Sequence, residues 1–160
     1  LDTGLAASIG VSVPSRRPIE QMSLSSSYGM RVHPVTGKLA RHNGIDIPAP
    51  YGTPIYATAD GIVGRAQRLG GYGNYVEVEH GNAIQTRYGH MSSYIVHPGQ
   101  QVKKGDILGY VGSTGRSTGN HLHYEVRIEG APVNPMPFVR SDQLTIAAIT
   151  GGKLAMGGPE

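Results

Sequence analysis

The stretch Asn-His-Leu-His-Tyr-Glu-Val at residues 120–126 gives the clearest secondary-structure signal in the chain. Polar and apolar residues alternate along it, which is typical of a β-strand with one face against a core. Side chains two positions apart on a strand point to the same face, roughly 6–7 Å from each other. His121 and His123 are therefore expected to project side by side, while Leu122 and Tyr124 face the opposite way.

Two histidines on one face of a strand can contribute to a metal site. A zinc ion could bind one imidazole at ~2 Å and leave the other close by as a catalytic neighbour. The same pair could also be two exposed polar residues on a half-buried strand. The other histidines and carboxylates of the chain have to decide between these interpretations.

The composition favours a compact, turn-rich β protein. The 160 residues suffice for one ordinary domain, and 24 glycines and 11 prolines indicate many turns. Short apolar runs separated by glycine turns predict strands at residues 54–58, 62–69, 74–80 and 84–90. We therefore expect a mainly β fold, an antiparallel sheet or sandwich-like structure with few helices.

Charge and residue usage exclude several classes of protein. The formal net charge is +3, and no cluster of lysine or arginine is dense enough to indicate nucleic-acid binding. No run of 18 apolar residues occurs, so we expect no membrane span in this chain. The absence of cysteine excludes disulfides and thiolate ligands, so a zinc ion would be held by histidine and carboxylate.

Further candidate site residues lie near predicted turns. On a straight strand, His42 and Asp46 would be about 13 Å apart, too far to share a metal ion. A helix would bring them together, but the Asn-Gly pair at residues 43–44 and Pro48 disfavour a helix. A sharp bend at the Asn-Gly pair would also bring them together. His90 is predicted at the end of a strand, where a loop can direct it into a cleft.

These motifs, in this order, resemble the lysostaphin/LytM-type zinc metallopeptidases, which cleave cross-links of bacterial peptidoglycan. The motifs are residues 28–37 (Tyr-Gly-Met-Arg-Val-His-Pro-Val-Thr-Gly), 42–47 (His-Asn-Gly-Ile-Asp-Ile), 88–91 (Tyr-Gly-His-Met), 102–109, 114–115 (Thr-Gly) and 119–125 (Gly-Asn-His-Leu-His-Tyr-Glu). The resemblance covers residues 18–138, which we predict to be the catalytic domain. Residues 1–17 are predicted to be a linker or extended arm, and residues 139–160 a C-terminal tail.

The resemblance implies a role for each residue that matches a family motif. His42, Asp46 and His123 match the ligands of one zinc ion per chain, which would lie at the floor of a groove. His90 and His121 match the two catalytic histidines that are not ligands. The resemblance does not settle which of these two is the general base.

The sequence also offers candidates around the metal site. We expect Arg31, His33 and Asn74 to contribute to substrate binding, Arg31 because its guanidinium can bind a carboxylate through two hydrogen bonds. Glu125 faces the same side of its strand as the two neighbouring histidines. It could support a zinc ligand through a hydrogen bond, or form a salt bridge that stabilises the fold. Both interpretations stay open.

The function that the resemblance implies is zinc-dependent hydrolysis of peptidoglycan cross-links outside the cytoplasm, in the periplasm or cell wall. We expect a D,D-endopeptidase acting on direct cross-links rather than on glycyl-glycine bonds, because residues 31–37 resemble those of Gram-negative envelope members. The chain begins with Leu1 and Asp2, and we expect it to be a fragment of a longer bacterial envelope protein. Its oligomeric state is left open.

Three alternatives are weaker. A non-catalytic LytM-type regulatory or peptidoglycan-binding module would have lost ligands, whereas all five site residues are present here. A zinc D-Ala-D-Ala peptidase of another type shares the ligand set but needs more helix. A biotinyl or lipoyl carrier is suggested only by the hairpin-like segment 102–109, in which Lys103 and Lys104 lack the sequence context of a modified lysine.

Overall fold

The computed structural model describes residues 12–23, 28–32, 37 and 39–140. The strands are β1 (Gly29–Val32), β2 (Leu39–His42), β3 (Ile45–Pro48), β4 (Pro54–Tyr56), β5 (Gly61–Arg68), β6 (Asn74–Glu79), β7 (Ile84–Tyr94), β8 (Gln101–Val102), β9 (Ile107–Val111), β10 (His121–Ile128) and β11 (Ala131–Val133). A 3-10 turn, η1 (Gly70–Tyr72), and a short helix, α2 (Met136–Arg140), complete the described part. The predicted mainly β fold is confirmed.

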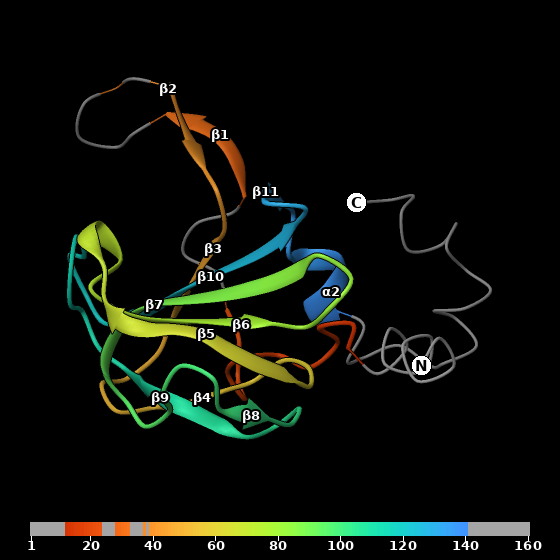
Figure 1. The fold of residues 1–160 in the computed structure, drawn as a ribbon. Coiled ribbons are helices and arrows are strands. Elements are labelled where there is room, and N and C mark those ends of the chain that lie inside the picture. Colours follow the sequence, from red (N-terminus) through yellow and green to blue (C-terminus); the bar gives the residue numbers. More distant parts are fainter. Residues whose placement is uncertain (1–11, 24–27, 33–36, 38, 141–160) are drawn as a thin grey trace.

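All strand pairs are antiparallel, which confirms the predicted pairing. The main sheet has the order β11-β10-β7-β6-β5-β8, and β3 pairs with β10 while β9 pairs with both β4 and β7. In Figure 1, β4, β8 and β9 lie below the sheet formed by β10, β7, β6 and β5. The folded sheet encloses the apolar core between these two layers.

The alternation predicted for residues 120–126 is present in β10. Leu122, Tyr124 and Val126 are completely buried in the core, whereas His121 and His123 are partly exposed on the opposite face. Two strands share one edge of β10, because β3 pairs with its first half and β11 with its second half. The histidine end of β10 is therefore fixed on both sides, by β3 and by β7.

Strand β7 does not end at His90, as the sequence predicted, but continues to Tyr94. At His90 the backbone has φ 62°, a left-handed conformation that is uncommon for a residue other than glycine. The strand changes partner at this residue, from β10 (up to Gly89) to β9 (from Met91). His90 thus lies at a kink inside a strand, where the two layers of the sheet join.

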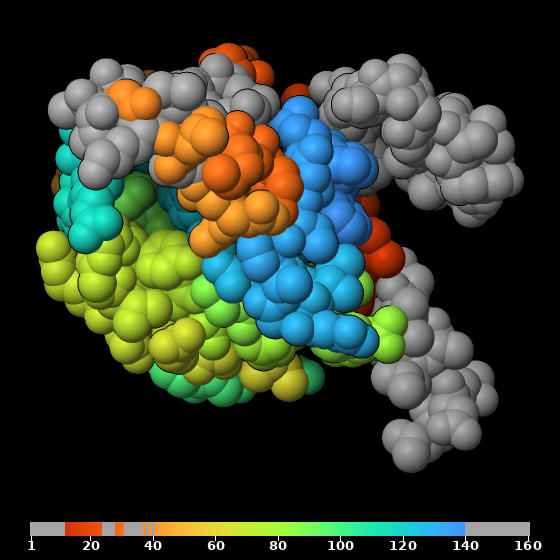
Figure 2. Space-filling model, turned by 90° about the horizontal axis from the view of Figure 1, so that it is seen from above, coloured from red at the N-terminus to blue at the C-terminus, as the bar shows by residue number. Residues whose placement is uncertain are grey.

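The β1–β2 hairpin projects from the body of the protein (Figure 1). Its register places Gly29 opposite His42, so His42 lies at the base of the hairpin. The Tyr28 hydroxyl donates to the Pro132 carbonyl (3.0 Å) and accepts from the Arg41 guanidinium (2.9 Å). The space-filling view in Figure 2 shows the hairpin, in orange, against the blue C-terminal part of the described chain.

The segment before the hairpin lies against the lower layer. The amide of Arg16 donates to Thr58 O, and the amide of Tyr56 donates to Pro18 O. The Arg16 guanidinium also lies 4.0 Å from the centre of the Tyr56 ring. The domain boundaries predicted after residues 17 and 138 stay predictions, and residues 1–11 and 141–160 lie outside the described part. None of the described helices has the length and apolar character needed to cross a membrane.

Candidate metal centre

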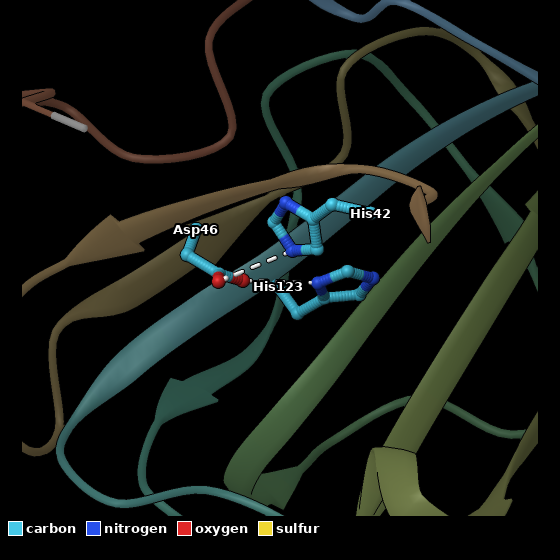
Figure 3. A group of neighbouring side chains, drawn as sticks. All are labelled: His42, Asp46 and His123. Atoms are coloured by element: carbon cyan, nitrogen blue, oxygen red, sulfur yellow. Dashed lines mark hydrogen bonds and ion pairs between the residues drawn. The ribbon is translucent and has the colours of Figure 1, made fainter. Parts of the chain in front are cut away.

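Three strands bring one potential metal ligand each to the same place. His42 ends β2, Asp46 lies in β3 and His123 lies in β10, directly opposite Asp46. One ligand atom from each residue lies within 4.8 Å of those of the other two. Figure 3 shows the three side chains pointing toward one another above the sheet. The sequence prediction that these residues come together is confirmed.

A bend at Gly44 allows His42 and Asp46 to meet. The chain bends there between β2 and β3, and the His42 Nε2–Asp46 Oδ2 distance is 3.2 Å. At this point the backbone passes tightly over β10. A Cβ atom on Gly44 would lie 2.3 Å from Tyr124 O and 2.8 Å from Glu125 Cγ. Only glycine fits at this position without displacement of β10, so Gly44 is needed for this geometry.

The Asp46 carboxylate is the electrostatic centre of the group. Its Oδ1 lies 3.0 Å from His123 Nδ1 and 3.5 Å from His121 Nε2, and its Oδ2 lies next to His42. Burial alone would raise the pKa of Asp46, but hydrogen bonds from these three histidines hold that pKa far below its usual range. Burial lowers the pKa of His123, but Asp46 and Glu125 outweigh it and raise this pKa to about 9.

The donor set fits a zinc ion. Two imidazole nitrogens and one carboxylate oxygen are typical zinc ligands, and three protein ligands characterise catalytic rather than structural sites. The three side chains are 10–15% exposed, so the centre is accessible yet well packed. Among the described residues, this is the one such group of histidine and carboxylate ligands. The predicted cofactor, one zinc ion, is therefore consistent with the structure.

His90 and His121 lie beside the three ligands, with ring centroids 4.8 Å apart. His121 Nδ1 lies 2.9 Å from Gly119 O, and His90 Nδ1 lies 2.7 Å from Thr114 O. A carbonyl oxygen only accepts hydrogen bonds, so in both rings Nδ1 carries a proton and donates it. In a neutral ring of this tautomer, Nε2 is the nitrogen that can accept a proton; in His121 this atom lies 3.5 Å from Asp46 Oδ1. The centre thus combines three potential metal ligands with two histidines whose Nδ1 atoms are bonded to backbone carbonyls.

The loop at residues 112–119 positions both of these histidines. The Thr114 hydroxyl donates to Met91 O (2.6 Å) and accepts from the backbone N–H of Asn74 (3.0 Å). These two hydrogen bonds fix the loop to β6 and β7. A Cβ atom on Gly115 would lie 2.3 Å from Gly73 N, so these two glycine loops pack in direct contact. The sequence analysis did not reveal that carbonyls of this loop anchor the two histidines.

Glu125 makes both of the contacts that the sequence left open, a hydrogen bond to His123 and a salt bridge to Arg127. Its Oε2 lies 2.7 Å from His123 Nε2, and its Oε1 accepts from the Arg127 guanidinium at 2.9 Å. Tyr72 donates its hydroxyl to the same carboxylate (3.0 Å), and its ring lies 5.9 Å from the ring of His123. Sequence reasoning missed Tyr72 and Arg127. An aromatic residue between glycines and a His-x-His-x-Glu-x-Arg spacing were the available signals.

The predicted substrate-binding residues are only partly described. Arg31 pairs with Ala40 in the hairpin, but its side chain lies outside the described part, and so does all of His33. The Asn74 side chain donates through Nδ2 to Ser92 O (3.1 Å) and so supports β7 beyond His90. The roles of these three residues in substrate binding stay predictions.

Comparison with known proteins identifies the family. The model of peptidase family M23 matches residues 40–135, which include all three ligands and both further histidines. The chain belongs to peptidase family M23. This confirms the resemblance found in the sequence and excludes the carrier alternative.

Individual M23 proteins resemble the chain over most of its length. The "DD-carboxypeptidase/endopeptidase Mpg" of Neisseria meningitidis is 49% identical over 74% of this chain. A crystal structure of a zinc-containing peptidase from Vibrio cholerae has a TM-score of 0.72 and 40% identity, and covers 76% of this chain and 39% of the other. The catalytic domain of lysostaphin from Staphylococcus simulans has a TM-score of 0.67 and 32% identity, over 74% of this chain and 92% of that domain. The matched part spans only 27% of the length of the Neisseria protein.

Proposed function

We propose that this M23 chain is a zinc-dependent endopeptidase that hydrolyses peptide cross-links of bacterial peptidoglycan. The observation that carries the proposal is the placement of two anchored histidine bases beside an intact His-Asp-His ligand set. A degenerate regulatory module would not need this complete set. The Neisseria relative, whose name includes DD-endopeptidase activity, is more similar than lysostaphin, which favours direct D-alanyl cross-links over glycyl bridges.

His42, Asp46 and His123 would hold the zinc ion, which supplies a Lewis acid that polarises the scissile carbonyl and acidifies water. His42 Nε2 and His123 Nδ1 face the Asp46 carboxylate, so these are the nitrogens that would bind the metal. With the metal bound, these nitrogens would carry no proton. The hydrogen bond from His123 Nε2 to Glu125 is compatible with that state.

His121 and His90 would move the protons of the reaction. The lone pair on Nε2 of one ring accepts a proton from the attacking water, while its Nδ1–H stays bonded to a backbone carbonyl. The same group can then donate this proton to the leaving amine, so that the new amine and carboxylate account for all atoms of the water. The second ring, protonated, can donate to the oxygen on which negative charge develops.

Substrate recognition is assigned to the surface around these histidines. Arg31 lies in β1, two residues before His33 in the sequence, and Asn74 lies opposite Met91, the residue that follows His90. We assign them to binding of the peptide on either side of the scissile bond, in a groove above the zinc ion. Because the substrate is cell-wall polymer, the proposed location is outside the cytoplasm. The proposed catalytic domain comprises residues 18–138.

The test is digestion of two purified peptidoglycans, one with direct D-alanyl cross-links and one with polyglycine bridges. Product masses should show cleavage of the direct cross-link by the zinc-loaded protein and no products with Asp46→Ala. Cleavage of polyglycine alone would overturn the bond assignment. Failure of the zinc-loaded protein to cleave either polymer, or a soluble cross-linked peptide, would overturn the enzymatic function.

A further inference from the structure

We propose that Glu125 is a positioning residue that presents His123 to the metal, with Arg127 and Tyr72 holding the carboxylate in place. The inference rests on the proposed zinc centre and adds a determinant of metal affinity to it. His123, Glu125 and Arg127 are spaced two residues apart along β10. Their side chains therefore lie on the same face of the strand.

The contact between Glu125 and His123 selects one orientation of the ring. Glu125 Oε2 lies 2.7 Å from His123 Nε2, and the glutamate is only 1% exposed. An ionised carboxylate only accepts hydrogen bonds, so Nε2 carries a proton that it donates to Glu125. This leaves His123 Nδ1, 3.0 Å from Asp46 Oδ1, as the atom that faces the metal site. A carboxylate in this position also strengthens the imidazole as a ligand.

The two oxygens of Glu125 have different partners, which prevents rotation of the carboxylate. Oε1 accepts from Arg127 through Nε and Nη2, both at 2.9 Å, and Arg87 Nη1 lies 4.0 Å from the same oxygen. Oε2 accepts from Tyr72 and from His123. The guanidinium groups of Arg127 and Arg87 therefore hold Oε1, and this orientation directs Oε2 toward His123.

Glu77 provides a matched control in the same sheet. It is also buried (6% exposed), accepts a tyrosine hydroxyl (Tyr75, 2.7 Å) and pairs with an arginine (Arg65 Nε, 3.0 Å). It lies in β6, opposite Arg87 of β7. Among the interactions of the described residues, its partners are Tyr75 and Arg65, and neither is a ligand of the metal centre. Loss of the Glu77 charge should thus lower the stability of the fold but leave the orientation of His123 unchanged.

The experiment compares Glu125→Gln with Glu77→Gln. Zinc affinity, measured by competition with a chromophoric chelator, should fall about 10- to 100-fold in Glu125→Gln. It should stay within about twofold of wild type in Glu77→Gln, although both variants lower the melting temperature of the metal-free protein. In zinc-loaded samples, the His123 Nε2–H resonance should move upfield in Glu125→Gln alone, because its acceptor is no longer charged.

A second variant tests the role of the cations without touching the carboxylate. Arg127→Met keeps an unbranched side chain but removes both donors to Oε1, and should weaken zinc binding several-fold with the same direction of the His123 shift. Wild-type zinc affinity in both Glu125→Gln and Arg127→Met, or an equal loss in Glu77→Gln, would overturn the inference. His123→Ala separates it from the proposed centre: retention of zinc in that variant would refute the centre itself.

Discussion

His121 and His123 are chemically identical and two residues apart, yet they present opposite ring nitrogens to the centre. His121 uses Nδ1 for the Gly119 carbonyl and turns Nε2 toward Asp46. His123 uses Nε2 for Glu125 and turns Nδ1 toward Asp46. The two residues therefore differ in the partner of the ring nitrogen that points away from Asp46. This partner is a backbone carbonyl for His121 and a carboxylate for His123. A metal ligand benefits from the charged partner.

This difference predicts opposite results for two alanine variants. His123→Ala should lose both zinc and activity, because one of three ligands is removed. His121→Ala should keep its zinc while turnover falls about 10²- to 10⁴-fold, the usual loss for a general acid or base. His90→Ala should behave like His121→Ala. Zinc content and turnover of a soluble cross-linked peptide, measured on the same samples, check the prediction.

The double variant His90→Ala, His121→Ala adds information. If both rings serve one proton-transfer unit, the double variant should lose less transition-state stabilisation than the sum of the losses in the two single variants. An empty metal site in His121→Ala together with a filled one in His123→Ala would show that the assigned roles are reversed.

At the scale of elements, the bend between β2 and β3 depends on Gly44. We expect Gly44→Ala to destabilise the protein by about 1–3 kcal/mol, because the methyl group would overlap Tyr124 O and Glu125 Cγ. Zinc affinity should fall as well, since His42 and Asp46 flank the bend. Denaturant unfolding and chelator competition measure the two effects.

Gly119→Ala is the control for this substitution. A Cβ atom there meets nothing within 4 Å. The control should therefore match wild type in both unfolding and zinc binding. An equally stable Gly44→Ala with normal zinc affinity would contradict the proposed reason for this glycine.

The 112–119 loop should affect activity without affecting the metal. Thr114→Val removes the hydroxyl that bonds Met91 O and the backbone N–H of Asn74. The loss should loosen the Thr114 carbonyl, which anchors His90. We expect zinc to be retained, turnover to fall about tenfold or more, and stability to decrease by about 1–3 kcal/mol. Thr53→Val, in the exposed turn where Thr53 donates to Pro50 O, should leave turnover unchanged. Normal turnover in Thr114→Val would contradict the anchoring role.

At the scale of the whole molecule, a buried chain of hydrogen bonds crosses the core. His80 Nδ1 donates to Asp60 O (2.7 Å), so Nε2 accepts from the Thr86 hydroxyl (2.7 Å). The chain continues from Thr86 to Tyr88 (2.8 Å) and from Tyr88 to Thr58 (3.1 Å). It ends at Tyr124 of β10, whose hydroxyl donates to Thr58 (2.9 Å). It joins segments from both layers of the sheet.

This chain predicts a pH dependence of stability. Burial lowers the pKa of His80 below 6.5, although its hydrogen bond to Asp60 O opposes the shift. The unfolded chain therefore takes up a proton near pH 6.5 that the folded protein does not. The contribution of His80 to stability is thus present above this pH and is lost as the pH falls, by at most about 1.4 kcal/mol per pH unit.

The measurement is the free energy of unfolding between pH 8 and pH 5 for the zinc-loaded wild type and His80→Gln. The difference between the two proteins isolates His80, because other titrating groups are common to both. The advantage of the wild type should decrease as the pH falls below about 6.5. Parallel pH profiles of the free energy of unfolding in the two proteins would contradict a lowered pKa of His80.

The sequence by itself determined the fold class and the kinds of ligand that a metal centre could use. Strand periodicity is local, so the alternation in residues 120–126 predicted both the strand and the face that carries His121 and His123. The absence of cysteine restricted the ligands to histidine and carboxylate, and the Asn-Gly pair indicated the bend that joins His42 and Asp46. Each of these properties depends on few neighbouring residues.

Only the tertiary structure decided how each side chain is used. The continuation of β7 through His90 depends on a change of strand partner, which no local pattern encodes. The ring nitrogen that each histidine presents depends on acceptors from a separate loop and from the neighbouring strand positions, such as Thr114 O and Glu125. Tyr72 reaches Glu125 across 53 residues of sequence. Contacts of this range are set by packing of the whole chain, so they become visible only in three dimensions.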